Sequence, residues 1–188
     1  MKRLRMGLLT AAVVAFAASA AVASATTITS PVGTLYTGEI NAASEGHVIL
    51  DNPIAKIECA WALSGNVKSH GSGATATISL TNFATTNCTN SWHYTTVSPG
   101  TWEIHWTSPN NGTVTWTGMT TESTRFGITC RYATSSTDYG LLTGKAPATI
   151  DINAAIPFHS GSGLCGEGAT TLTGSLTVNT PASLLVDS

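Results

Sequence analysis

The chain has 188 residues, of which 42% are hydrophobic and 10% are charged, and its formal net charge is −2 at pH 7. This composition excludes a highly charged disordered chain, a coiled coil and a strongly basic nucleic-acid-binding protein.

The first 25 residues are typical of a secretory signal peptide. Lys2, Arg3 and Arg5 precede an apolar, alanine-rich run that ends in small residues at 23–25. Cleavage after Ala25 would leave residues 26–188, which we expect to form one secreted or cell-surface domain. Cleavage also removes three of the eight cations, so the net charge changes from −2 to −5. The remaining cations are scattered, and no later segment is long and apolar enough to cross a bilayer, so we expect neither nucleic-acid binding nor a membrane span.

The exported part is predicted to be all-β. Alternating apolar residues and β-branched residues recur between turn residues, and no long segment has helical periodicity. The predicted strands cover residues 33–41, 46–50, 54–63, 74–83, 91–97, 101–107, 113–119, 125–132, 148–156 and 170–178, with a short apolar strand at 184–186. Nine to ten strands at this spacing indicate an antiparallel β-sandwich, with a β-barrel as the alternative.

A tryptophan-rich meander is predicted between residues 92 and 117. Trp102, Ile104 and Trp106 alternate along one strand, so they share a face, which we assign to the core. Trp92 and Tyr94 share a parity on the preceding strand, and we expect them to be exposed. Exposed indoles on a sheet are a common platform for sugar rings. The candidate ligand-binding residues are therefore Trp92, Tyr94 and His105.

Cys59, Cys88, Cys130 and Cys165 all follow the predicted leader. An even number of cysteines in an exported chain favours two disulfides over a zinc site, because no pair has Cys-x-x-Cys spacing. Three pairings are possible. We favour Cys59 with Cys88 and Cys130 with Cys165, because each pair closes a local loop.

The sequence contains few residues that could form a metal-binding or catalytic site. His93 and His105 lie on neighbouring predicted strands, but a metal site needs a third ligand such as Glu103 or Glu122, and the spacing does not demand one. The same two glutamates could act as paired carboxylates on a glycan. We predict no catalytic residues, metal or cofactor.

The placement of cysteines and glycines resembles that of small exported bacterial proteins, some of which are labelled activator of alkane oxidation. The resemblance is carried by Cys59 with Gly65, by Cys88 followed by Trp92, by the segment at 127–130 and by Cys165. It implies a disulfide-bonded, non-catalytic, extracytoplasmic β protein, and it assigns no functional residue.

Three functions follow from these patterns, in order of preference. The first is an exported β-sandwich that acts through its surface in the cell envelope or extracellular matrix, by adhesion to envelope components or by self-association. The second is a carbohydrate-binding module with an aromatic patch. The third is a metal-dependent or glycan-cleaving enzyme.

Overall fold

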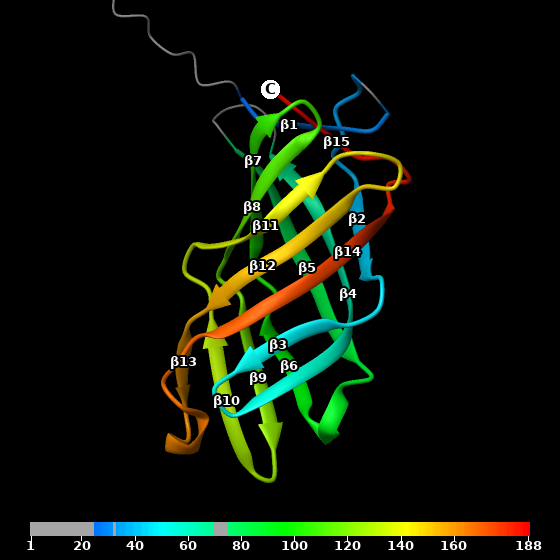
Figure 1. The fold of residues 1–188 in the computed structure, drawn as a ribbon. Helices are drawn as coiled ribbons and strands as arrows, with labels where there is room; N and C mark the ends of the chain where they lie inside the picture. The colour runs from blue at the N-terminus through cyan, green and yellow to red at the C-terminus, as the bar shows by residue number, and fades with distance from the viewer. Residues whose placement is uncertain (1–24, 32, 70–74) are drawn as a thin grey trace, which may run out of the picture.

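The computed structural model describes residues 25–31, 33–69 and 75–188, so the predicted signal peptide lies outside the described residues except for Ala25. These residues form strands joined by turns, with two short 3-10 segments (Figure 1). The strands of the first half are β1 (Thr27–Thr29), β2 (Glu39–Ser44), β3 (Val48–Asn52), β4 (Ala55–Ser69), β5 (Ala76–Thr86), β6 (His93–Ser98) and β7 (Thr101–Ser108). The second half contains β8 (Asn111–Thr117), β9 (Thr120–Arg125), β10 (Ile128–Ala133), β11 (Thr137–Thr143), β12 (Thr149–Ile156), β13 (Phe158–Gly161), β14 (Thr170–Thr180) and β15 (Leu185–Asp187). The 3-10 segments are η1 (Thr89–Ser91) and η2 (Gly163–Cys165).

The largest sheet closes on itself. Its strands follow the order β12-β11-β8-β7-β5-β4-β2-β14, and β14 pairs again with β12 over the whole of β12. Each of these pairings is antiparallel. The all-β prediction is therefore confirmed, and the closed cycle corresponds to the barrel, the second of the two arrangements left open by the sequence.

β2 and β3 together occupy one position in the barrel wall. Both pair with β4 on one side and with β14 on the other, and β3 continues along these partners where β2 ends. The interruption spans residues 45–47, where Gly46 adopts a φ of +100° that a side-chain-bearing residue rarely takes. The barrel therefore has a local break in an otherwise continuous edge-free wall.

A second sheet, with the strand order β13-β10-β9-β6, extends one end of the barrel (Figure 1). Its strands are continued by β12, β11, β8 and β7, which are neighbours in the barrel in that same order. Three of the four junctions contain glycine or proline: Pro99-Gly100, Gly118 and Pro157. Four barrel strands thus bend and continue as this small sheet.

The small sheet packs against the lower part of the barrel wall. Trp61 of β4 stacks on Tyr94 of β6, with ring centroids 6.4 Å apart, and Trp61 also meets Phe83 of β5 edge-on at 4.6 Å. Further inside the barrel, Trp102 and Trp116 lie at 0% exposure beside the equally buried Tyr139. The core assignment of Trp102 is confirmed, whereas Trp106 is only partly buried.

The predicted meander is correct for one of its two turns. β7 and β8 form a hairpin, with Trp102 opposite Trp116. β6, however, pairs with β9 in the small sheet, and β7 pairs with β5 on its other side. The expectation of a β6–β7 pairing was wrong, because the Pro99-Gly100 junction redirects the chain from one sheet to the other.

Candidate functional site

Trp92 and Tyr94 are buried, so the expectation that they face solvent was wrong. Their exposed fractions are 8% and 6%, while His93 between them is exposed. The Tyr94 hydroxyl donates a hydrogen bond to Thr121 Oγ1 at 2.8 Å, beneath the small sheet. The prediction that Trp92 and Tyr94 face the same way was correct, but alternation along a strand does not reveal which of its two faces packs against the barrel. An aromatic surface for sugar stacking is therefore missing at these two residues.

The third candidate, His105, belongs to another part of the molecule. It lies on β7 in the barrel wall, opposite Thr113 of β8, whereas Tyr94 lies on β6 in the small sheet. The structure therefore does not bring His105 together with Trp92 and Tyr94.

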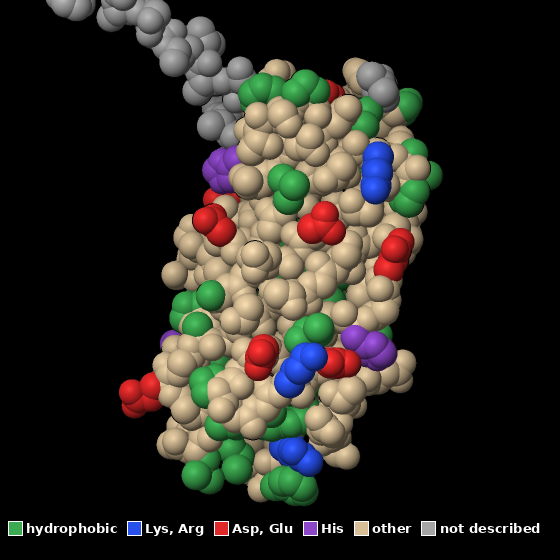
Figure 2. Space-filling view, in the orientation of Figure 1, with side chains coloured by type: hydrophobic (Ala, Val, Ile, Leu, Met, Phe, Trp, Pro, Cys, Tyr) green, Lys and Arg blue, Asp and Glu red, His purple; other side chains and the backbone are tan. Residues whose placement is uncertain are grey.

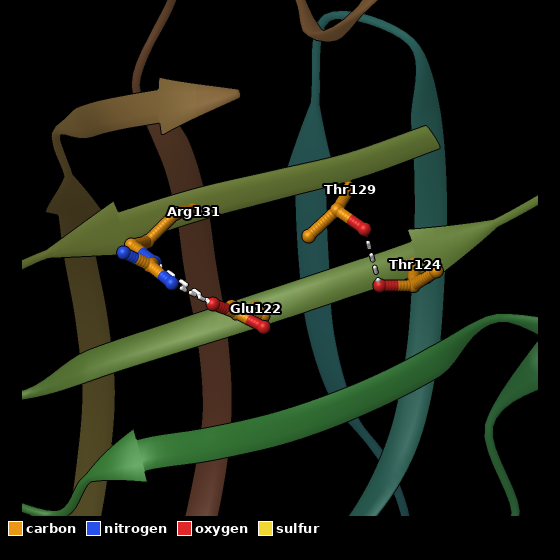
Figure 3. A network of polar contacts seen from close by, with 4 residues as sticks. All are labelled: Glu122, Thr124, Thr129 and Arg131. Carbon is orange, nitrogen blue, oxygen red and sulfur yellow. Dashed lines mark hydrogen bonds and ion pairs between the residues drawn. The ribbon is translucent and has the colours of Figure 1, made fainter. Parts of the chain in front are cut away.

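Glu122, a candidate metal ligand and acid, is held by an ion pair on the outer face of the small sheet (Figure 3). Arg131 donates to Glu122 Oε1 through Nε at 2.9 Å and through Nη2. The two residues are direct cross-strand partners, as are Thr124 and Thr129, whose hydroxyls are 3.0 Å apart. Glu103 lies in the other sheet, within reach of Thr117. Across the described residues, no group of three His, Cys, Asp or Glu side chains could hold a metal ion.

All four cysteines are oxidised, and both favoured pairings are confirmed. The disulfides join Cys59 to Cys88 and Cys130 to Cys165. Cys88 directly precedes η1, and Cys165 is the last residue of η2. Each disulfide therefore fixes a 3-10 turn to a strand.

The β9–β10 hairpin projects an aromatic side chain into solvent. Arg125 pairs with Ile128, which leaves Phe126-Gly127 as a two-residue turn with φ values of +51° and +78°. Positive φ at both positions matches the type I′ hairpin turn, whose twist suits the flanking strands. Phe126 is consequently 85% exposed at the tip of the hairpin.

Two more exposed apolar side chains come from neighbouring turns. Leu164 of η2 is 65% exposed, and Ile54 of the β3–β4 turn is 42% exposed. The backbone of η2 lies beside β10, because Ser162 N–H donates to Thr129 O. We refer to Ile54, Arg125, Phe126 and Leu164 as the tip surface. Figure 2 shows hydrophobic side chains gathered near a cationic one at this end of a mostly uncharged molecule.

Arg125 is the cation of the tip surface, and it is stacked between two rings. Its guanidinium carbon lies 4.6 Å from the Phe126 ring centroid and 5.9 Å from that of Trp92. Its Nε is buried and has no hydrogen-bond partner among the described residues. The ion pairs in the described part of the chain are Lys56–Glu58 and Arg131–Glu122, so Arg125 has no carboxylate partner there. Cation–π contacts of this kind hold the charge in place without neutralising it.

η1 positions Trp92 under Arg125. The Cys59–Cys88 disulfide fixes the start of η1 to β4, and Glu58 N–H donates to Thr89 Oγ1 at 3.0 Å. Sequence reasoning singled out Trp92 but missed Arg125 and Phe126. The available signal was the Phe126-Gly127 dipeptide, because glycine favours a turn, but both residues were included at the start of the predicted strand at 125–132.

The barrel interior is filled. Trp102, Trp116 and Tyr139 pack together, and burial raises the pKa of Tyr139 well above its ordinary value. Burial raises the pKa of Tyr94 strongly as well. Among residues 25–31, 33–69 and 75–188, side-chain packing leaves no detectable pocket.

Within the described ranges, no helix is long and apolar enough to cross a membrane. The two disulfides are compatible with an oxidising, extracytoplasmic compartment. The resemblance to exported proteins labelled activator of alkane oxidation stays an expectation. No protein-family model, curated protein or solved structure matches this chain.

Proposed function

We propose that this chain is an exported contact protein, present at the cell surface or secreted, which acts by adhesion through its tip surface rather than by catalysis. One observation carries the proposal: both disulfides fix the turns at the end of the molecule where Phe126 and Leu164 are exposed. Ordering exposed apolar side chains costs stability unless they meet a partner. An apolar end whose turns are held by disulfides is therefore suited to bind a partner.

The remaining surface supports the same proposal. Threonine occupies many outward positions of the strands, such as Thr171 and Thr173 on β14 and Thr113 on β8. Its hydroxyl keeps a β surface soluble with little charge, which suits an extracellular protein. The tip surface then differs from its surroundings by its large apolar side chains and its stacked cation.

Cell fractionation tests the proposal. The full chain, exported by a bacterial host through its own leader, is compared with the Phe126→Ser variant and with a Val97→Ser control, since Val97 is also 55% exposed but lies on β6 outside the tip surface. We expect wild type and control in the envelope fraction and Phe126→Ser in the soluble fraction. Equal distribution of all three proteins would reject adhesion through the tip surface.

A further inference from the structure

The tip surface presents an apolar side chain from each of three different turns. Phe126 comes from the β9–β10 turn, Leu164 from η2 and Ile54 from the β3–β4 turn. These turns are linked through β10 and the segment after η2: Ser162 and Cys165 attach η2 to β10, and a Cβ at Gly168 would lie 2.8 Å from Pro53 Cγ in the β3–β4 turn. The tip surface therefore offers a partner one exposed apolar side chain from each turn.

The partner must also complement Arg125. This cation has no carboxylate among the described residues, and its stacking between Trp92 and Phe126 holds it beside the exposed Phe126 ring. A partner that complements the tip surface therefore carries anionic groups next to an apolar layer. A bilayer containing anionic phospholipids has this layered chemistry, with phosphates above acyl chains, and aromatic rings favour the boundary between them.

A second copy of the chain fits less well. A two-fold contact pairs the tip surface with itself, so it brings two Arg125 cations into one contact, and none of the four tip-surface residues is a carboxylate that could pair with either. Like charges brought together in an apolar contact oppose association, whereas lipid phosphates favour it.

Resting on the proposed function, we infer that the tip surface docks onto an anionic phospholipid bilayer. Phe126, Leu164 and Ile54 enter the headgroup region, and the Arg125 guanidinium pairs with lipid phosphate. The Cys130–Cys165 disulfide holds η2, which carries Leu164, against β10, and the Cys59–Cys88 disulfide holds η1, which precedes Trp92.

Vesicle co-sedimentation of the oxidised protein spanning residues 26–188 tests the inference. Binding is measured to vesicles of phosphatidylglycerol mixed with phosphatidylcholine and to vesicles of phosphatidylcholine alone. We expect Phe126→Ser to weaken binding to the anionic vesicles roughly tenfold, because it removes an inserted ring. Arg125→Gln should weaken it about fivefold and abolish the preference for anionic lipid. Val97→Ser should bind as wild type does.

Matching thermal unfolding curves and absence of free thiols establish that each variant is folded before its binding is compared. Equal binding of wild type and both tip variants overturns the inference. If the wild type ignores vesicles while its envelope association still depends on Phe126, adhesion stands and the lipid assignment is wrong. If sedimentation equilibrium instead reveals a dimer that Phe126→Ser dissociates, the occupant is a second copy and the lipid assignment is again wrong.

Discussion

Tyr94 and Tyr139 place phenol groups in the apolar interior. Their exposed fractions are 6% and 0%, and desolvation raises the pKa of both side chains. The Thr121 hydroxyl, which can donate a hydrogen bond to the ionised phenol, lowers the pKa of Tyr94, but this is the smaller effect. Both phenols therefore stay protonated in the folded protein at pH values where an exposed tyrosine ionises.

Alkaline pH should consequently destabilise the fold. Above about pH 10 the unfolded chain releases these two protons and the folded chain keeps them, so the free energy of unfolding falls by about 1.4 kcal/mol per pH unit for each tyrosine. Below that pH the stabilisation from this source is fully present. Urea unfolding at several alkaline pH values measures the slope. Tyr139→Phe should make the slope shallower by one tyrosine, and a flat profile up to about pH 11 would contradict the raised pKa values.

Gly140 lies where two neighbouring strands approach closely. A Cβ at this position of β11 would sit 2.0 Å from the Asp151 carbonyl oxygen of β12. We expect Gly140→Ala to lower the free energy of unfolding by about 2 to 4 kcal/mol, because β11 and β12 must separate. Gly163→Ala is the matched control, since nothing lies within 4 Å of its Cβ position. Chemical denaturation should leave the control within about 0.5 kcal/mol of wild type; comparable losses in both variants would reject the steric explanation.

At the scale of elements, most strands were predictable, and β9 and β11 were missed for two different reasons. β12 alternates between buried and outward-facing residues along its length, β14 does so only at its start, and the residue ranges of both were predicted closely. β9 was missed because its inward residues are Thr121 and Ser123, which are 0% and 1% exposed but polar. β11 was missed because Gly140 interrupts it. Periodicity of apolar residues cannot reveal a strand whose buried face is polar.

The candidate site was harder to predict than the fold. Local loop closure was enough to favour the correct disulfides. The tip surface, in contrast, depends on which turns lie at one end of the barrel. The turns at Ile54 and Leu164 are distant in sequence, and the residues around each one do not indicate that the two lie at the same end. The burial of Trp92 had the same origin, because η1 places it against Arg125, a residue from another hairpin.

Each disulfide acts on a single element, because it fixes one 3-10 turn to a strand. The paired cysteines are 29 and 35 residues apart, so the loop-entropy model assigns about 3 to 4 kcal/mol of stability to each. We expect a Cys130→Ala/Cys165→Ala variant to lose about that amount in urea unfolding. Peptide mapping of the unreduced protein should yield the Cys59–Cys88 and Cys130–Cys165 linkages. A fragment linking Cys88 to Cys130, or equal stability of the oxidised and variant proteins, would refute this.

For the whole molecule, the two ends of the described chain meet in a separate small sheet that packs against one end of the barrel. β1 pairs with β15 through Ile28 and Val186, which are both fully buried. This two-stranded sheet attaches to the end of the barrel opposite the tip surface: Thr26 Oγ1 accepts from Trp106 N–H at 2.9 Å, and Val186 O accepts from Asn110 N–H at 3.1 Å. Folding therefore needs contacts across nearly the full sequence, which makes it slow relative to folds with local contacts.

A substitution at Val186 measures how much the packing of the terminal strands against the barrel contributes to stability. Its side chain is 0% exposed and packs near Gly112, where an added Cβ would lie 3.3 Å from Val186 Cγ1. We expect Val186→Ala to lower the free energy of unfolding by about 2 kcal/mol, because it removes two buried methyl groups where the terminal strands meet the barrel. Val97→Ala removes the same groups from a 55% exposed site, so it should change stability by less than about 0.5 kcal/mol. Equal effects of the two substitutions in urea unfolding would mean that the packing of the terminal strands against the barrel contributes nothing to stability.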